Sequence, residues 1–514
     1  MSESNNTSRL SNELADLCVS ESLSEEGLRE IIQRRGLTKH NINHVDDYDF
    51  FSEACRNERL NEGIIRCLIE YFPDAISAVD DESGCLPLHQ ACNNRNVTLE
   101  IIKLLVDTAP HSVRSVDNYG DTPLHILCIS RKWDAAAIQI LEFIIEKYPE
   151  AVRHANSSGF LPIHRASVRS SPEFCRVLIE AYPGCERIAD ADGVLPLHNA
   201  CSYNSLATVE YLYSIYKDAI HHTTTLGYPI HFTISSINIR ADPMTAAEIV
   251  QFLLDCDPDQ KLKQFQGMSL LHYACEREYG FYTIEAAVQT IQVLFDAHPE
   301  AIYDNGIALD RYDHQVQEFL NNQLFYARQA KDHRLMTTHD NNGRLPLHRA
   351  IQNNVRLGSI KLLVKGNPAA LQSADNSGAL PLHVACMHHD SVNVIQYLVE
   401  LDQSTLDAMD RDGNTALHLL CHGARHDAIA LLLDEFDAVS VSTRNADKKL
   451  PIDMLWESDS VKDRESKEYT ESMYRLLRAN PEMIMGIDMQ QIQSSASTSS
   501  TLPCQVGKKR KLGL

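Results

Sequence analysis

The sequence predicts an all-α protein built as a long stack of helix–turn–helix repeats. A phrase close to D-x-x-G-x-L-P-L-H-x-A-C recurs along the 514-residue chain. Most copies are followed by a segment whose apolar residues recur at intervals of three and four, the spacing of one helix face. Self-similarity at a fixed period of about 20–50 residues is typical of stacked-repeat proteins, whose neighbouring repeats bury one another's apolar faces.

The residue that opens each Leu/Thr-Pro-Leu-His segment marks the phase of the repeat. It lies at residues 86, 122, 161, 195, 228, 269, 345, 380, 415 and 450. The spacings are 33–41 residues except for one of 76, which follows residue 269. The copies LGYPIHFTI (226–234) and QGMSLLHYAC (266–275) are degenerate, and the last copy, DKKLPIDML (447–455), lacks the His.

Each part of the phrase has a physical role. Asp and Gly in D-x-x-G suit a tight turn, because Gly accepts a positive φ at no steric cost. Pro, as at Pro87 and Pro123, fits the first turn of a helix, where its missing N–H is no loss. A second helix follows, as at 99–110 and 392–402, and a Pro such as Pro110 often ends it.

In both phrase and period the chain resembles the ankyrin-repeat family, whose repeat of about 33 residues carries T-P-L-H-x-A. The resemblance covers roughly residues 47–485, and Leu in place of Thr before Pro is the main departure. It implies an ankyrin-repeat solenoid with short hairpin-like turns. It also implies a function in protein binding, through the turn tips and the exposed, concave side of the first helices.

The ends of the chain are predicted to differ from its middle. Residues 1–45 are rich in Ser, Asn and Glu, which predicts disorder apart from a short helix at 27–35. The solenoid then spans residues 46–485 with about 10–11 repeats, and 46–75 forms an N-terminal cap. Residues 469–484 resemble a capping helix, and 486–514 form a disordered Ser/Thr-rich tail.

The spacing of 76 residues corresponds to one repeat plus an insertion near residues 304–338. Six apolar residues of the insertion fall at helical spacing and predict an amphipathic helix. They are Leu309, Tyr312, Val316, Phe319, Leu320 and Leu324. This helix either packs on the solenoid or offers a docking face.

His and Cys recur together as H-x-x-C, and each pair has half of the ligands of a zinc site. Because the pairs recur at the repeat period, successive pairs would lie a repeat apart, too far for one metal ion, and we interpret them as framework residues. The Cys then acts as a small core hydrophobe. The family resemblance implies that the His bonds to turn backbone near the helix start. The repeat histidines are His89, His125, His164, His198, His231, His272, His348, His383 and His418.

The chain is not predicted to be an enzyme. It contains no G-x-x-x-x-G-K-[ST], G-x-S-x-G or H-E-x-x-H motif. With 14 Cys and 70 acidic residues, a nucleophile or a carboxylate pair cannot be diagnosed from sequence. We expect no metal, no cofactor and no small-molecule substrate.

The net charge of −23 makes the chain a poor binder of nucleic acid and suits a basic partner, or merely keeps the protein soluble. The polar N-terminus does not resemble a signal peptide, and no apolar run approaches the length of a membrane span. We therefore expect a monomer in the cytoplasm or nucleus, without a membrane association.

The predicted protein-binding residues lie at turn tips and after His-x-Ala-Cys in the first helices. Aromatic side chains are the best candidates for anchors, since they dominate binding hot spots. Each could equally pack against a neighbouring repeat. The candidates are Tyr119, Arg131, Trp133, Tyr203, Asn204, Asn353, His388 and His389.

A basic cluster near the C-terminus, Lys508, Lys509, Arg510 and Lys511, follows the Ser/Thr-rich segment. It is typical of a nuclear-import signal or a nucleic-acid contact, and it could also be a merely solvated tail. The leading hypothesis is a protein-binding scaffold or adaptor in the cytoplasm or nucleus. The alternatives are the substrate-recognition subunit of a larger ligase or kinase assembly, and a purely structural assembly protein.

Overall fold

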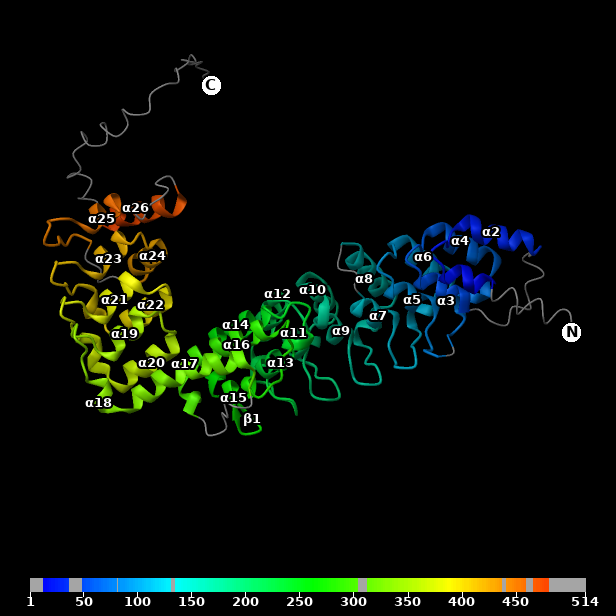
Figure 1. The fold of residues 1–514 in the computed structure, drawn as a ribbon. Coiled ribbons are helices and arrows are strands. Elements are labelled where there is room, and N and C mark those ends of the chain that lie inside the picture. Colours follow the sequence, from blue (N-terminus) through cyan, green and yellow to red (C-terminus); the bar gives the residue numbers. More distant parts are fainter. Residues whose placement is uncertain are drawn as a thin grey trace, which may run out of the picture. The chain divides into compact units, whose positions relative to one another are not determined.

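The computed structural model describes residues 13–36, 49–80, 82–130, 135–303, 312–436, 441–458 and 466–479. Over these residues the fold consists almost entirely of helices, which confirms the predicted all-α class (Figure 1). The chain divides into two compact units, which we call the N-terminal body, residues 1–320, and the C-terminal body, residues 321–514.

Pairs of helices repeat along each body, and each helix packs on its counterpart in the next repeat. The first helices are α3 (Asp49–Arg56), α5 (Pro87–Asn93), α7 (Pro123–Ile129), α9 (Pro162–Arg169), α11 (Pro196–Tyr203), α13 (Pro229–Ser235), α15 (Leu270–Cys275), α19 (Pro346–Gln352), α21 (Pro381–His388), α23 (Ala416–His422) and α25 (Pro451–Glu457). The second helices are α4 (Glu62–Tyr71), α6 (Leu99–Thr108), α8 (Ala135–Lys147), α10 (Pro172–Ala181), α12 (Leu206–Ile215), α14 (Thr245–Cys256), α16 (Ile284–Ala297), α20 (Leu357–Gly366), α22 (Val392–Leu401), α24 (His426–Glu435) and α26 (Lys467–Ala479).

The apolar residue that precedes His in the phrase builds the core between successive first helices. It is buried in every copy that carries the His, because the first helices within each body pack against one another. A fully buried Leu or Ile contributes about 1.5–3 kcal/mol through its removal from water. These residues are Leu88, Leu124, Ile163, Leu197, Ile230, Leu271, Leu347, Leu382 and Leu417.

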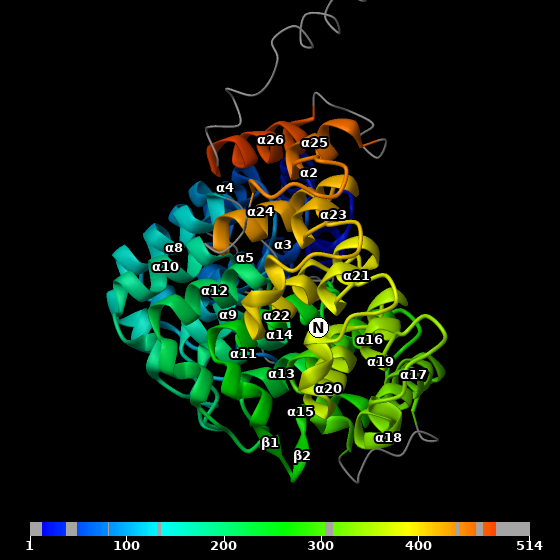
Figure 2. The ribbon, with the colours of Figure 1, turned by 90° about the vertical axis from the view of Figure 1, so that its left-hand side faces the viewer.

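One two-stranded hairpin interrupts the helical pattern in a degenerate copy of the phrase. Strand β1 (Gln264–Phe265) pairs antiparallel with β2 (Met268–Ser269). Figure 2 shows this hairpin projecting beyond α13 and α15. It takes the place that the short turn has in the regular repeats.

The prediction of disorder for residues 1–45 is wrong for residues 13–26, whereas a helix is observed where a short one was predicted at 27–35. Residues 13–19 are helical, and α2 (Glu25–Arg34) packs on α4. The polar composition hides apolar residues at helical spacing, of which Leu14, Leu28 and Ile32 are buried. The repeat at 46–75 is therefore covered on its N-terminal side by a further pair of helices.

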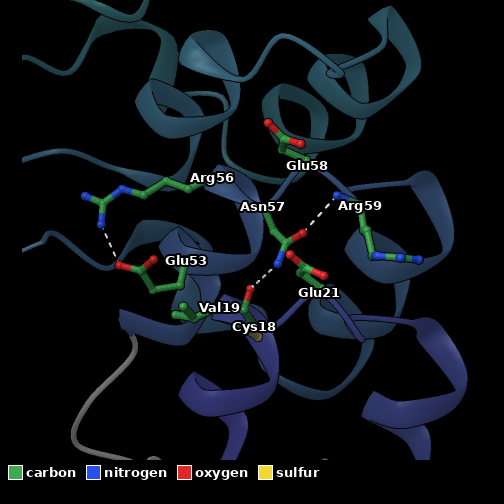
Figure 3. Close-up of a pocket in the computed structure, with 8 residues that line it drawn as sticks. All are labelled: Cys18, Val19, Glu21, Glu53, Arg56, Asn57, Glu58 and Arg59. Carbon is green, nitrogen blue, oxygen red and sulfur yellow. Dashed lines mark hydrogen bonds and ion pairs between the residues drawn. The ribbon is translucent and has the colours of Figure 1, made fainter.

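This N-terminal junction contains a hollow of about 430 Å³, which we call the N-terminal hollow (Figure 3). Several of its polar side chains are already partnered. The Asn57 side-chain amide donates to the Cys18 carbonyl over 2.8 Å, and Arg56 pairs with Glu53 at 2.5 Å. The contacts of Asn57 hold the 13–19 helix against α3.

The predicted helix of the insertion is observed as α17 (His314–Lys331), followed by the short helix α18 (His333–Met336). In the N-terminal body Val316 and Leu320 are buried, and Phe319 packs edge-on against Phe295 with ring centroids 5.9 Å apart. These contacts favour packing over a docking face, while Leu309 lies outside the described residues. The predicted capping helix is α26, where Tyr469 and Leu476 are buried.

Successive turns are joined by backbone hydrogen bonds. The Asn118 N–H donates to the Ser83 carbonyl over 3.0 Å, and the Ser157 N–H donates to the Tyr119 carbonyl over 3.0 Å. The same bond joins the pairs Ala191 and Ser158, Asn376 and Asn342, Arg411 and Ser377, and Ala446 and Asp412. The turns thus form a ladder along each body.

This ladder needs glycine for two separable reasons. Gly120 has φ +77°, and a Cβ there would lie 2.9 Å from the Ser157 nitrogen. Gly193 occupies the same place in its turn with φ +79°, but an added Cβ would meet no atom within 4 Å. We expect Gly193→Ala to cost about 1–2 kcal/mol through the left-handed backbone alone. Gly120→Ala should cost at least about 1 kcal/mol more, since the turns must also separate.

Urea denaturation of the wild type and of both variants measures the loss in the free energy of unfolding. Equal losses would show that the close approach of the turns contributes nothing to stability.

Candidate functional site

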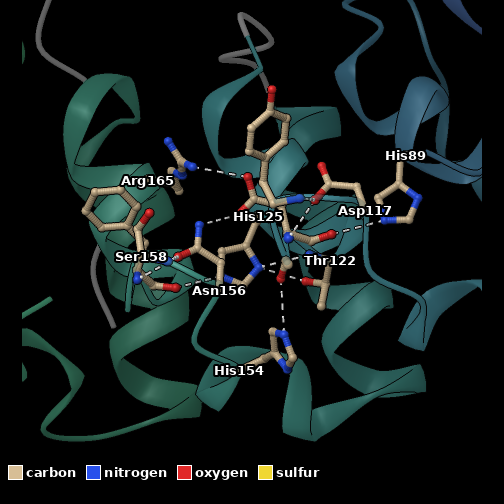
Figure 4. Close-up of polar contacts among 12 residues, drawn as sticks. His89, Asp117, Thr122, His125, His154, Asn156, Ser158 and Arg165 are labelled. Atoms are coloured by element: carbon tan, nitrogen blue, oxygen red, sulfur yellow. Dashed lines mark hydrogen bonds and ion pairs between the residues drawn. The ribbon is translucent and has the colours of Figure 1, made fainter. Parts of the chain in front are cut away.

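The repeat histidines belong to the framework between neighbouring repeats (Figure 4). His125 Nδ1 accepts the backbone N–H of Thr122 at 3.2 Å, just before α7. Its Nε2 donates to the Phe160 carbonyl of the next repeat at 2.9 Å. One imidazole therefore caps its own helix, in the position of a capping-box Glu or Gln, and also holds the next turn.

Every repeat histidine except His272 makes this capping bond. The second bond recurs in five more repeats, where Nε2 meets a carbonyl of the following turn region at 3.0–3.3 Å. In His164 and His231 the buried Nε2 makes no such bond. The histidines that make both bonds are His89, His125, His198, His348, His383 and His418.

His272 departs from the pattern because Ser269 provides the cap of α15 itself. The Ser269 hydroxyl accepts the His272 backbone N–H at 3.4 Å. The imidazole instead contacts Glu276 at 3.4 Å. The framework role predicted for the His272 side chain is thus corrected: it takes no part in the capping of its helix.

Burial sets the protonation states of these framework residues. It lowers the pKa of His198 to about 3 and raises the pKa of the Cys175 and Cys386 thiols to about 12. An imidazole with so low a pKa is a very weak base, and thiols with so high a pKa stay protonated at neutral pH, so these groups are unsuited to act as a general base and a thiolate nucleophile. Within the described part of the chain, no three His, Cys, Asp or Glu side chains gather where a metal ion could bind.

The predicted binding residues do not form one cluster. Tyr119 lies at a turn tip with 68% of its surface exposed, and Tyr203 lies at the end of α11, also exposed. Asn353 and His388 are exposed near the ends of α19 and α21. Arg131 and Trp133, and the basic cluster Lys508, Lys509, Arg510 and Lys511, lie outside the described residues.

Two of the candidates serve the framework instead. The Asn204 side-chain amide donates to the Ser167 and Ser170 carbonyls of the preceding repeat at 3.0 and 2.9 Å. His389 is buried, which corrects its predicted place on the surface, and its Nε2 bonds to the Val355 carbonyl at 2.9 Å. Both side chains are hydrogen-bonded to backbone carbonyls of the preceding repeat, so they are not free to bind a partner.

A hollow of about 500 Å³, which we call the aromatic hollow, lies between the turn tips and the first helices of the two degenerate repeats. The turns at 224–227 and 264–269 do not continue the backbone ladder among the described residues, and the hollow lies beside them. Its lining residues are Thr225, Leu226, Phe232, Ser235, Phe265, Gln266, Met268, Tyr273, Glu276 and Arg277.

The walls of the aromatic hollow are packed rings. Phe265 lies edge-on to Tyr273 with centroids 5.7 Å apart, and His231 lies 5.2 Å from Tyr273. The Arg277 guanidinium stacks 4.5 Å from the centroid of Tyr273. Burial, together with the charge of Arg277, lowers the pKa of His231 to about 4. The hollow thus combines an apolar wall with exposed polar groups at its rim.

Sequence reasoning missed this hollow, although a signal was present. The residue directly after the repeat His is aromatic only as Phe232 and Tyr273. The other copies place varied aliphatic or polar residues there, such as Gln90 or Arg165. The departures of these two degenerate copies from the phrase line the hollow.

Comparisons with known proteins agree with the repeat pattern. A family model described as ankyrin repeats (3 copies) matches residues 37–150 and 307–410. No curated protein matches the chain. None of the helices in the described segments combines the length and the apolar character that a membrane crossing requires.

Proposed function

The chain belongs to the ankyrin-repeat family, and we propose that it is a scaffold or adaptor that binds a partner protein through its turn tips and the adjoining first-helix surface. Ankyrin repeats are generally protein–protein interaction modules and are typically non-enzymatic. The proposal adds to this general role a particular surface and a particular mode of binding.

The aromatic hollow is the observation that carries the proposal. It lies where turn tips meet first helices, and its rings are held by packing against one another. Leu226 stands at its rim with 60% of its surface exposed. Rigid aromatic walls beside an exposed aliphatic residue suit the apolar anchor of a partner, because hot spots form in well-packed, desolvated pockets.

Two other roles make different predictions. A substrate-recognition subunit of a ligase or kinase assembly would be recovered together with enzyme subunits. A purely structural assembly protein would be recovered with copies of itself or with structural partners. Mass spectrometry of proteins that copurify with the full chain separates these roles from the proposed adaptor.

Leu226→Asp should reduce the recovery of a bound partner at least about tenfold, since it places a charge at the rim where an apolar group is expected to dock. The matched control is Leu262→Asp, because Leu262 follows α14, is 57% exposed and does not line the hollow. The measurement is quantitative affinity capture of the full chain with each variant. If both variants recover the partner as the wild type does, the hollow is not the binding site.

A further inference from the structure

A second surface lies at the opposite end of the first helices from the turn tips. A groove of about 680 Å³ runs along the connections between first and second helices in three successive repeats. We call it the loop groove. It is lined by residues 169–172, 203–205 and 239–242, together with Thr245. It belongs entirely to the N-terminal body.

The floor of the loop groove is held by a buried arginine. The Arg240 guanidinium donates to the Cys201 carbonyl at 2.5 Å and to the Asn204 carbonyl at 2.6 Å. Its Nε donates to the Thr245 hydroxyl at 3.3 Å. Asn204 is itself bonded to the preceding repeat. These hydrogen bonds fix the floor of the groove before any partner binds. Binding would therefore lose little conformational entropy in this part of the chain.

Exposed apolar side chains line and extend the groove. Tyr203 is 41% and Ile239 62% exposed. Asn238 joins the next loop, since its amide donates to the Glu278 carbonyl at 2.7 Å and its carbonyl oxygen accepts from the Thr283 hydroxyl at 2.6 Å.

That next loop carries two adjacent aromatic side chains, Phe281 and Tyr282, which are 87% and 92% exposed. Contiguous apolar side chains of this size on a surface mark an interaction site.

The charges of the loop groove differ from those of the other two hollows. Arg169 and Arg240 face one acid, Asp242. The aromatic hollow has one acid and one base, and the N-terminal hollow has three acids and two bases.

Arg169 is exposed, and no ion pair joins it to an acidic group within the described part of the chain. A site with excess positive charge in a chain of net charge −23 favours an acidic partner group at that point.

We infer that the loop groove binds a peptide segment of a partner protein that carries aliphatic or aromatic side chains and an acidic residue placed against Arg169. The apolar side chains contact Tyr203 and Ile239, and the carboxylate pairs with the guanidinium of Arg169. This inference rests on the proposed function only in treating the chain as a binding module, because the loop groove and the aromatic hollow share no lining residue.

The test is selection of a random dodecapeptide library, displayed on phage, against the immobilised full chain. Selected peptides are then synthesised, and their affinity is measured by fluorescence anisotropy. We expect sequences enriched in aromatic or aliphatic residues and in Asp or Glu. Arg169→Glu and Ile239→Asp should each weaken binding about tenfold or more. Both residues are exposed, so the fold should persist, and circular dichroism checks that it does.

Two controls separate this site from the rest of the surface. Arg176→Glu makes the same charge change in the same repeat, but Arg176 pairs with Glu173 and Glu180 on α10 and does not line the groove. Leu226→Asp tests the aromatic hollow. Neither should alter binding of the selected peptides.

Three results would overturn the inference. They are selected peptides that are basic, binding that Arg169→Glu and Ile239→Asp leave unchanged, and failure to enrich any peptide. Loss of binding with Leu226→Asp alone would also overturn it, while supporting the proposed function at the aromatic hollow.

Discussion

Acidification from pH 7 to pH 5 is expected to destabilise the N-terminal body by about 6 kcal/mol, because three of its buried histidines are neutral in the folded state. Burial lowers the pKa of His125 to about 4, of His198 to about 3 and of His231 to about 4. In an unfolded chain the imidazole pKa is about 6.5. Nδ1 of each ring accepts a backbone N–H, and protonation would destroy this acceptor.

The direction of the effect follows from proton binding. Below about pH 6.5 the unfolded chain binds more protons than the folded chain, so stability is complete above that pH and falls as the pH approaches the folded pKa. At pH 5 each of the three histidines accounts for a loss of about 2 kcal/mol. The sum is a large share of the roughly 5–15 kcal/mol by which a typical domain is stable.

Urea unfolding followed by circular dichroism at pH 7, 6 and 5 measures this loss. His198→Gln provides an internal control, because Gln can accept the same helix-capping N–H and does not titrate. This variant should have a lower free energy of unfolding than the wild type at pH 7. The decrease in that free energy between pH 7 and pH 5 should be smaller by about a third. A stability that stays constant over this range would contradict the proposed protonation states.

His383→Ala is expected to cost about 2–4 kcal/mol in the C-terminal body. The imidazole accepts the Leu380 N–H at 3.0 Å and donates to the Ala408 carbonyl at 3.0 Å. Its removal leaves a cavity and two backbone groups without their partner, each of which costs about 1–3 kcal/mol when it stays buried. Burial also lowers the pKa of His383, so the wild-type side chain is neutral at neutral pH.

Hydrogen exchange should locate the damage. Contacts in a repeat array are mainly between nearest neighbours, so protection should fall most in α21 and in the adjoining α19 and α23, and least in α5 and α7. His388→Ala is the matched control on the same helix, because His388 is exposed and should cost less than about 0.5 kcal/mol. Equal losses for the two variants, or a uniform fall in protection across the chain, would contradict the model of local coupling.

Short-range rules explain what was predictable from the sequence. The start of most first helices follows from Pro at the first position and His three residues after the cap, as with Pro87 and His89. The helical nature of the insertion follows from the spacing of Val316, Phe319 and Leu320. The period itself, repeated along the chain, predicts that each repeat is covered by its neighbours.

Contacts between repeats decided the remaining features. Asn204 and His389 looked like surface residues, but each bonds to carbonyls 34–37 residues earlier, which lie next to it only after stacking. The helices at 13–36 lie in a polar stretch, and their few apolar residues become a core only against α3 and α4.

By itself the sequence determined the repeat, its phase and the framework role of histidine and cysteine, because local backbone rules and a recurring period specify them. The tertiary structure alone decided which departures from the repeat form a surface. Phe232 and Tyr273, from two first helices, line one hollow, and Tyr203 and Ile239, from two successive repeats, line one groove. Such sites depend on distances between residues far apart in the chain, and a single sequence does not record these distances.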